Sequence, residues 1–253
     1  MRKVERVVVW VSGGVSSMVA AKLAIKKYKG IYEITLAICD TGSEHDENWR
    51  FIRDGERWLN HDITVLKSEK YTDTIDVYEK TKWLVGVRGA RCSQELKKAV
   101  RQKFENIMGD LQIFGYAFDK KEQKRAHRFQ ENNPEIMCEF PLIDSELTKA
   151  NCQGIIFKAG IKRPSTYDYG FKEANCLKRG CVKGQAGYWN LYRKFNPDGF
   201  WAMARLERKL DVAICKTEKG GIRQRIFLDE LPLDQGNYKT EPPIQCGILC
   251  GEI

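Results

Sequence analysis

The sequence lacks any long apolar run, and it has few histidines and prolines for its 253 residues. A membrane-spanning helix needs about 20 mainly apolar residues, so we expect no transmembrane segment and no membrane partner. The apolar run at residues 7–11 is too short for a signal peptide, and no cleavage site of small residues follows it. We therefore expect a cytoplasmic protein.

Several catalytic and phosphate-binding patterns are also missing. His45, His61 and His127 are too scattered to suggest a catalytic histidine site, and no Ser-His-Asp set or carboxylate pair stands out. No Gly-Lys-Ser/Thr of a Walker A loop and no Gly-x-Gly-x-x-Gly is present. The sequence has no internal repeat or low-complexity segment, which excludes collagen-like, coiled-coil and disordered classes.

The composition is that of a globular protein with a basic balance. Apolar residues make up 42%, enough for a sizeable core, and 43 Lys and Arg against 34 Asp and Glu give a net charge of +9. Such a charge suits an anionic ligand or a nucleic acid. No single basic run dominates, and we interpret most of the basic residues as solvated helix faces.

Apolar runs and helical patterns alternate along the first half of the chain. Strands are expected at residues 6–11, 34–39, 63–66, 111–115 and 136–140. Helices are expected at residues 17–28, 47–59, 93–108 and 121–130. This alternation predicts an α/β fold with a mainly parallel sheet and helices on both faces.

The composition changes near Arg163 and Pro164, beyond which cysteine, glycine and aromatic residues are frequent. We expect a nucleotide-binding domain over residues 1–163. Residues 164–253 would form a cysteine-rich C-terminal subdomain that includes a helix over residues 201–210.

A candidate phosphate loop follows the first expected strand. It reads Ser12, Gly13, Gly14, Val15, Ser16 and Ser17. The glycines allow tight backbone geometry close to a ligand. Free N–H groups and the positive dipole end of the following helix form an anion site. The alternative is a plain turn with a serine helix cap, and we favour phosphate binding.

The loop resembles the Ser-Gly-Gly-x-Asp-Ser loop of PP-loop ATP pyrophosphatases, with Ser16 where that family commonly has an Asp that could help hold magnesium. Next, Cys39-Asp40-Thr41-Gly42 resembles the Asp-Thr-Gly of the phosphoadenosine phosphosulfate (PAPS) reductase branch. Asp40 would accept a hydrogen bond from a ribose hydroxyl or an adenine amine. The alternative role of Asp40 is to form the turn.

Further segments resemble landmarks of the same branch in the same order. They are Arg91 to Lys97, Gly115 with Glu122 and Arg125, Phe140 to Asp144, and Tyr167 to Gly170. The resemblance implies an adenine nucleotide alpha hydrolase-like fold that binds ATP or a related adenine nucleotide, with Mg²⁺, at the loop, Asp40 and Thr41. It also implies phosphate- or sulfate-binding catalytic roles for Lys97 and Arg125.

The nine cysteines are an odd number and lie unevenly. In a reducing compartment such a set favours metal or thiol chemistry over disulfides. Two short-spaced pairs, Cys176 with Cys181 and Cys246 with Cys250, can close on one four-thiolate site, either zinc or a 4Fe-4S cluster. Of the cysteines outside this site, we expect four to be small buried side chains. They are Cys39, Cys138, Cys152 and Cys215. The fifth is an exception.

The exception is Cys92, because adenylyl sulfate reductases carry a four-iron cluster with ligands from the corresponding region and from the later pair. The resemblance therefore allows a second ligand set, although we favour the first. It consists of Cys92, Cys176, Cys181 and one C-terminal cysteine.

The C-terminal sequence Gln245-Cys246-Gly247-Ile248-Leu249 resembles the Glu-Cys-Gly-x-His tail that carries the nucleophile of PAPS reductases, with Gln and Leu in place of Glu and His. We therefore favour an ATP-dependent adenylating enzyme for sulfur transfer or nucleic-acid modification. A sulfonucleotide reductase that uses Cys246 and a thioredoxin-like reductant is the second hypothesis. A non-catalytic nucleotide-binding iron–sulfur sensor is the third.

One segment mixes aromatic and basic residues. Residues 187–194 could stack on nucleic-acid bases, or could form a helix that packs its aromatic face beside the cysteines. We favour the second interpretation, because aromatic residues so often serve cores.

Overall fold

The computed structural model describes residues 3–86, 89–174, 176–219, 222–244 and 246. Its central sheet has five parallel strands in the order β3-β2-β1-β6-β7. The strands are β1 (Arg6–Trp10), β2 (Glu33–Cys39), β3 (Ile63–Leu66), β6 (Asp110–Phe114) and β7 (Met137–Glu139). Each crossover between these strands carries at least one helix, as parallel neighbours require.

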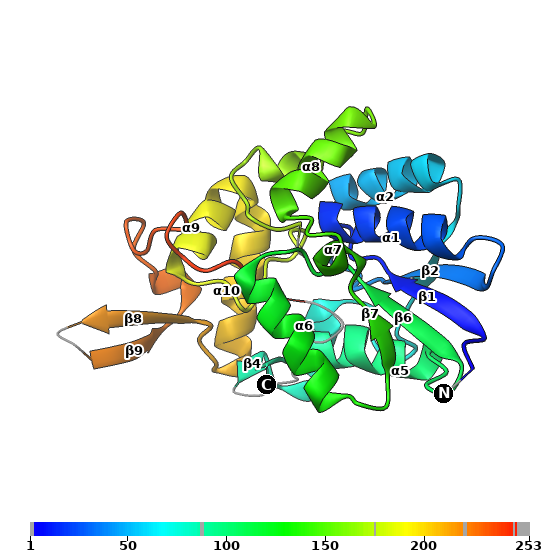
Figure 1. Cartoon of the computed structure of the whole chain (residues 1–253). Coiled ribbons are helices and arrows are strands. Elements are labelled where there is room, and N and C mark those ends of the chain that lie inside the picture. The colour runs from blue at the N-terminus through cyan, green and yellow to red at the C-terminus, as the bar shows by residue number, and fades with distance from the viewer. Residues whose placement is uncertain (1–2, 87–88, 175, 220–221, 245, 247–253) are drawn as a thin grey trace.

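Helices cover both faces of this sheet (Figure 1). One face packs against α1 (Val15–Tyr28), α2 (Asp46–Leu59) and α8 (Lys149–Lys158), and the other against α5 (Ala99–Phe104) and α6 (Lys120–Asn132). Side chains alternate between the faces, so Val7 and Val9 enter the first core while Val8 and Trp10 enter the second. The predicted parallel α/β fold with helices on both faces is confirmed.

A third core lies beside the sheet and contains most of the C-terminal part. It is built on α9 (Ala186–Phe195) and α10 (Pro197–Leu210), and it also takes residues from α3 (Thr74–Thr81). The hairpin of β8 (Cys215–Lys219) and β9 (Ile222–Ile226) projects from it (Figure 1). This core contains residues from both sides of position 163. The expected division into two domains stays a prediction.

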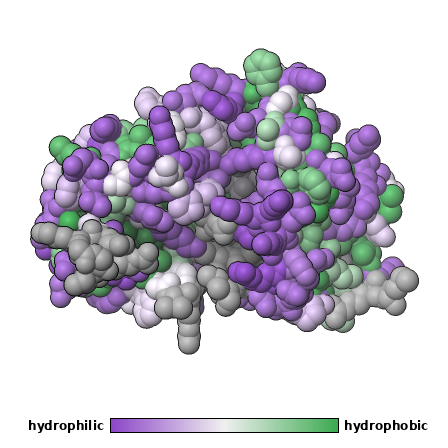
Figure 2. Space-filling view, turned by 60° about the vertical axis from the view of Figure 1, so that its left-hand side comes forward, coloured by the Kyte–Doolittle hydropathy of each residue, from purple (hydrophilic) through white to green (hydrophobic). Residues whose placement is uncertain are grey.

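Short elements complete the chain. They are β4 (Val85–Gly86), β5 (Gly89–Ala90), α4 (Arg91–Ser93), the π-helical turn η1 (Gln94–Lys98), α7 (Pro141–Asp144), and the 3₁₀ turns η2 (Ser165–Tyr167) and η3 (Leu228–Glu230). The face of the molecule in Figure 2 is mainly hydrophilic, with apolar residues in small scattered patches. In the described part of the chain, no helix has the length and apolar character needed to cross a membrane.

Two expected helices differ from the observed ones. The helix expected at 93–108 starts earlier, at Arg91, ends at Phe104 and contains the π-helical turn η1. The helix expected at 201–210 begins at Pro197, because the Asn196 side chain accepts a hydrogen bond from Gly199 N at 2.9 Å and caps it. On α9, Tyr188, Trp189 and Tyr192 are buried, which agrees with the packing interpretation of that segment.

Candidate functional site

The turn between β1 and α1 has the geometry of an anion-binding loop. Gly13 has φ +72°, a conformation that favours glycine. Ser17 Oγ lies 3.0 Å from Ser12 N and 3.1 Å from Ser12 Oγ, and it donates to Gly14 O at 3.0 Å. These bonds hold the loop in one shape, while α1 directs its first amides toward the carboxyl edge of the sheet.

A second turn approaches this loop closely. Gly115 follows β6, and a Cβ atom placed on it would lie 2.6 Å from Ser17 Cα and 2.9 Å from Ser17 N. Only glycine lets the two turns meet without a shift. The carboxyl ends of adjacent parallel strands β1 and β6 therefore bring both turns to the ligand-binding edge of the sheet.

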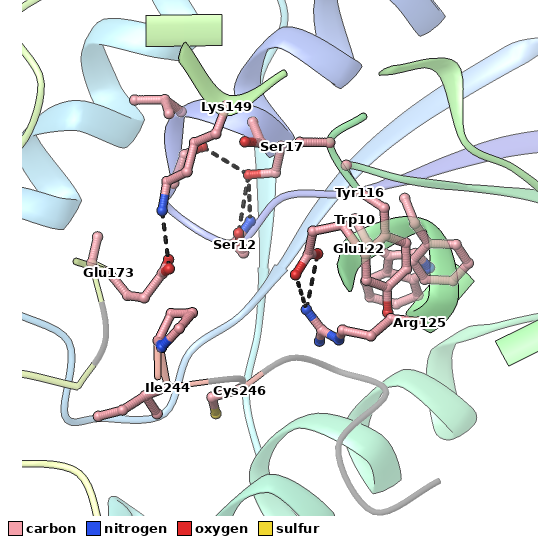
Figure 3. Close-up of a pocket in the computed structure, with 18 of the residues that line it drawn as sticks. Trp10, Ser12, Ser17, Tyr116, Glu122, Arg125, Lys149, Glu173, Ile244 and Cys246 are labelled. Carbon is pink, nitrogen blue, oxygen red and sulfur yellow. Dashed lines mark hydrogen bonds and ion pairs between the residues drawn. The ribbon is translucent and has the colours of Figure 1, made fainter. Parts of the chain in front are cut away.

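A cavity of about 570 Å³ opens at this edge. It is lined by Ser12, Gly14, Val15, Ser16 and Ser17 of the loop, and by residues from β6, α6 and the C-terminal part (Figure 3). Gly13 is not part of the lining, and a Cβ atom placed on it would point toward Asn48 and Ile52, 3.8 Å from each. The cavity is large enough for a small-molecule ligand such as a nucleotide.

Charged pairs stand on two sides of the cavity. Arg125 Nη1 lies 2.8 and 2.9 Å from the two carboxylate oxygens of Glu122, and its guanidinium lies over the Tyr116 ring (Figure 3). On the other side, Lys149 Nζ lies 3.0 Å from Glu173 Oε1. Arg125 is thus placed in the cavity that its predicted role requires, and that role stays a prediction.

Asp40 and Thr41 lie outside the cavity lining. Asp40 Oδ1 accepts a hydrogen bond from Gly42 N at 2.8 Å, the contact of a turn-forming aspartate, and Asp40 also pairs with Lys67 at 3.4 Å. Thr41 is buried, and its hydroxyl contacts Glu44 at 3.2 Å and the Cys176 sulfur at 3.2 Å. Their predicted contacts with a nucleotide stay predictions.

Lys97 lies at the cavity end nearest the cysteines. Burial alone would lower the pKa of its ammonium group, but the negative charges of Cys246, Glu44 and Cys176 raise this pKa well above its ordinary value. Lys97 therefore supplies a fixed positive charge beside several sulfur atoms, as well as toward a ligand in the cavity.

Four cysteines from three separate segments lie near one another. Burial is the main cause that raises the pKa of Cys92, Cys176 and Cys181, and the nearby charge of Cys246 raises the pKa of all three further. Burial and Cys246 raise the pKa of Cys92 to about 11. Among the described residues, no three His, Cys, Asp or Glu side chains are arranged to hold a single metal ion.

These four cysteines are the members of the second expected ligand set, the one with Cys92, and their role as ligands stays a prediction. Cys246 lines the cavity, and its sulfur lies 3.4 Å from the Ser93 hydroxyl. Cys250 of the first ligand set lies outside the described residues. The cysteines expected to be plain side chains are packed in the cores: Cys39 and Cys138 lie in or against the second sheet core, Cys152 in the first, and Cys215 in the C-terminal core. Cys39 also lines the cavity, and its sulfur lies 3.7 Å from Lys97 O.

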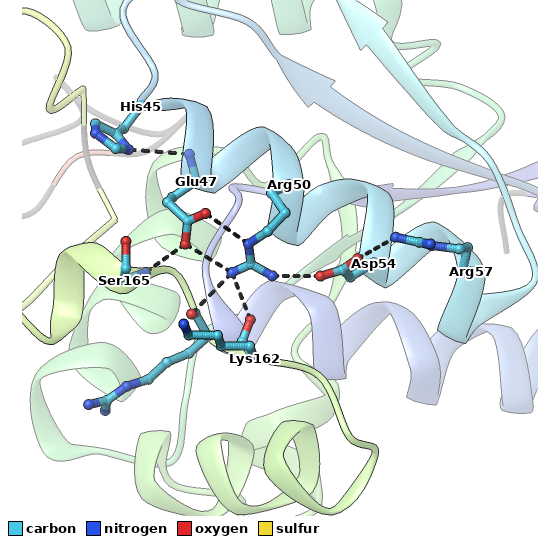
Figure 4. Close-up of polar contacts among 8 residues, drawn as sticks. His45, Glu47, Arg50, Asp54, Arg57, Lys162 and Ser165 are labelled. Carbon is cyan, nitrogen blue, oxygen red and sulfur yellow. Dashed lines mark hydrogen bonds and ion pairs between the residues drawn. The ribbon is translucent and has the colours of Figure 1, made fainter.

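A polar network holds the helix that carries Asn48 beside the loop. Glu47 accepts from Ser165 N at 3.0 Å and pairs with Arg50, which also bonds Asp54 (Figure 4). The hydrogen bond from Arg50 is the main cause that lowers the pKa of Glu47 to about 2. Arg50 in addition bonds two carbonyl groups at residues 162–163, so the network ties α2 to the connection with the C-terminal part.

Sequence reasoning missed several cavity residues. Lys149, Lys172 and Glu173 line it, as does the buried Glu44, which accepts from Asn48 Nδ2 at 3.0 Å. Glu44 follows the Asp-Thr-Gly sequence closely. Its place as a polar residue near the carboxyl end of a strand could have indicated a role in the site. No local pattern marks the other three, because only the tertiary fold brings them to the loop.

The parallel sheet, the glycine-containing turn after β1 and the charged cavity at the carboxyl edge together define an α/β protein of the kind that binds phosphorylated ligands. The sequence model of the phosphoadenosine phosphosulfate reductase domain matches residues 6–180, and the chain belongs to this family. A search of the curated proteins gave no significant match.

Two solved structures have a similar arrangement. A phosphoadenylyl-sulfate (PAPS) reductase from Candida auris, in a phosphate complex, is 13% identical with a TM-score of 0.49, over 66% of this chain and 79% of the other. The U34-tRNA thiolase NcsA from Methanococcus maripaludis, with its 4Fe-4S cluster, is 15% identical with a TM-score of 0.49, over 83% of this chain and 74% of the other.

Proposed function

We propose that the chain is a PP-loop enzyme that binds ATP and adenylates an acceptor in a sulfur-transfer or nucleic-acid modification reaction. One observation carries this proposal: the phosphate loop and Cys246, one of the four grouped cysteines, line the same cavity. A nucleotide held at Ser12 to Ser17 would therefore extend toward the sulfur chemistry. Family membership supports an adenine nucleotide as the ligand.

In this reaction an oxygen of the acceptor attacks the α-phosphorus of ATP, and the bond from this phosphorus to pyrophosphate breaks. A sulfur nucleophile then displaces AMP from the adenylated acceptor. The loop amides, Lys97 and Arg125 would stabilise the negative charge that moves onto the phosphate oxygens. Lys120 and Lys121 line the cavity at the start of α6, where they would attract the polyphosphate.

The four grouped cysteines are the candidate ligands of an iron–sulfur cluster. Cys92, Cys176, Cys181 and Cys246 would supply its four ligands, with hydroxyl groups of Thr41 and Ser93 beside two of the sulfurs. When bound, the cluster would supply a site for a sulfur donor or for electrons. Zinc held by four thiolates is the alternative.

The position of Cys246 also favours a second candidate, a sulfonucleotide reductase. The Cys246 thiolate would attack the sulfur atom of a nucleotide-bound sulfate, forming a sulfur–sulfur bond and breaking the sulfur–oxygen bond to the nucleotide. A dithiol reductant of the thioredoxin type would then release sulfite and become a disulfide. Ser93 and Lys97 stand near this thiol, where they would stabilise its thiolate.

Product analysis separates these functions. The purified protein is incubated with ATP, Mg²⁺, a sulfur donor and candidate acceptors, and pyrophosphate and AMP are measured. In parallel it receives adenylyl sulfate or PAPS with thioredoxin, and sulfite is measured. Acceptor-dependent pyrophosphate supports the first proposal, sulfite without pyrophosphate overturns it, and tight ATP binding without either product would favour a nucleotide sensor.

A pair of variants links the product to the site. Cys246→Ser removes the cavity thiol, and we expect it to lower either activity by at least about 100-fold, in line with the loss of a ligand or nucleophile. Cys138→Ser changes a thiol in β7 away from the cavity lining and should leave the activity within about twofold of the unchanged protein.

A further inference from the structure

The C-terminal tail, residues 237–246, is fastened to the start of α9 by one side chain. Gly187 N donates to Glu241 Oε1 at 2.6 Å, and Tyr188 N donates to Glu241 Oε2 at 3.0 Å. Both amides belong to the first turn of α9, where a helix has no partners of its own for its N–H groups. The carboxylate also meets the positive end of the helix dipole. Glu241 is thus a tail anchor with three favourable contacts.

Lys172 holds the same tail from the other side. Its backbone N–H donates to the Tyr238 hydroxyl at 3.0 Å. Its ammonium group donates to Lys239 O at 3.1 Å and to Glu241 O, and it lies over the Tyr238 ring. Lys172 also lines the cavity that contains the phosphate loop, so a single side chain touches both the tail and the ligand space.

The tail leads directly from these contacts into the cavity. Pro242 and Pro243 follow Glu241, and each has its φ fixed by the ring. Pro243, Ile244 and Cys246 then line the cavity. The two fixed φ angles restrict the path of the chain from Glu241 to Ile244, on the side of the tail where Cys246 lies.

We propose that Glu241 and Lys172 are positioning residues for Cys246, and that Lys172 couples nucleotide binding to the tail. An ammonium group has three donors. Two of them serve tail carbonyls, and among the described residues the third has no acceptor. A phosphate or sulfate oxygen in the cavity would take it as a strong charge-assisted bond. This inference rests on the proposed function only in requiring that a nucleotide binds.

Hydrogen–deuterium exchange of the full chain tests both residues, with ATP or PAPS binding measured separately by calorimetry. In the unchanged protein a saturating nucleotide should slow exchange of the amides at 238–241 and 244 by about fivefold, the effect of roughly one added hydrogen bond. Lys172→Met should remove this protection, and Lys172→Arg, which keeps the donors, should restore most of it. Without nucleotide, Glu241→Gln should speed exchange at Gly187 and Tyr188 by a similar factor.

Two matched variants exclude general effects. Lys158→Met removes an exposed lysine at the end of α8 that is not part of the cavity lining, and nucleotide protection of the tail should remain. Glu230→Gln removes an exposed carboxylate that bonds Arg208, and exchange at α9 should not change. Protection that survives Lys172→Met, or unchanged exchange in Glu241→Gln, overturns the inference. If neither nucleotide binds, the proposed function and the coupling both fail, while the Glu241 measurement still decides the anchor.

Discussion

At the scale of single residues, the phosphate loop depends on a glycine outside it. Gly115 lets the turn after β6 lie against Ser17, where a Cβ atom would come within 2.6 Å of backbone. Gly115→Ala should therefore lower the free energy of unfolding by about 1–3 kcal/mol. We also expect it to raise the Kd for ATP by at least tenfold, because the loop must shift. Urea unfolding and calorimetry measure the two effects.

A second glycine provides the control for this prediction. Gly154 lies within α8, and no atom lies within 4 Å of a Cβ placed on it. Gly154→Ala should leave ATP binding unchanged and stabilise the protein by up to about 1 kcal/mol, since alanine favours the helix. An unchanged Kd in Gly115→Ala would show that the close contact of the two turns does not shape the nucleotide site.

Residue chemistry could be predicted from the sequence where it follows a local pattern. The loop at 12–17 was visible because a buried strand, glycines and a helix follow one another directly. The roles of Lys172 and Glu241 could not be predicted from the sequence, because they depend on contacts between segments that are distant along the chain. Asp40 forms the contact of the turn interpretation, and its contact with a nucleotide stays a prediction.

At the scale of elements, one buried carboxylate holds the base of the β8–β9 hairpin. Glu207 in α10 accepts hydrogen bonds from Ile214 N and, at 2.6 Å, from Leu228 N, at the two ends of the hairpin. Burial raises the pKa of Glu207 to about 7, although both backbone hydrogen bonds act in the opposite direction. The folded protein therefore binds a proton that the unfolded chain, with a pKa of about 4.3, has already released.

The sign of the pH effect follows from this difference. Proton binding at Glu207 stabilises the fold at low pH, and this stabilisation is lost as the pH rises from about 4.3 through about 7. We expect a loss of roughly 4 kcal/mol from this group. Urea unfolding between pH 5 and 8 should show that the free energy of unfolding falls less steeply with pH in Glu207→Gln than in the unchanged protein. Glu230→Gln is the exposed control, and an equal slope in all three proteins would contradict the assignment.

Periodicity predicted the elements that alternate regularly and failed for the others. All five strands of the sheet were expected, because each is a short apolar run next to a helical pattern. The helix α8 and the hairpin were not expected. The apolar residues of segment 149–158 do not gather on one face of the helix. The hairpin strands carry many charged residues, such as Lys216 and Arg225. Their structure depends on tertiary packing more than on local pattern.

At the scale of the whole molecule, the cysteine group joins parts of the chain that are distant in sequence. Cys92 lies in α4, Cys176 and Cys181 in the loop before α9, and Cys246 in the tail. A cluster bound by all four would cross-link these segments in the folded state only, so it would stabilise the fold. Spacing in the sequence proposed cysteines as ligands, whereas only the tertiary arrangement shows that Cys92, from a distant segment, lies near Cys176, Cys181 and Cys246.

Metal analysis of anaerobically purified protein tests this arrangement. We expect about four irons and four sulfides per chain, as a 4Fe-4S cluster requires, and Cys92→Ser should lower both contents by more than half. Cys138→Ser, which changes a thiol outside the group, should keep them. Removing the iron with a chelator should lower the Tm of the unchanged protein by several degrees and that of Cys92→Ser much less, because that variant holds little cluster to lose. Full iron content in Cys92→Ser would exclude Cys92 as a ligand, and zinc without sulfide would replace the cluster by a mononuclear site.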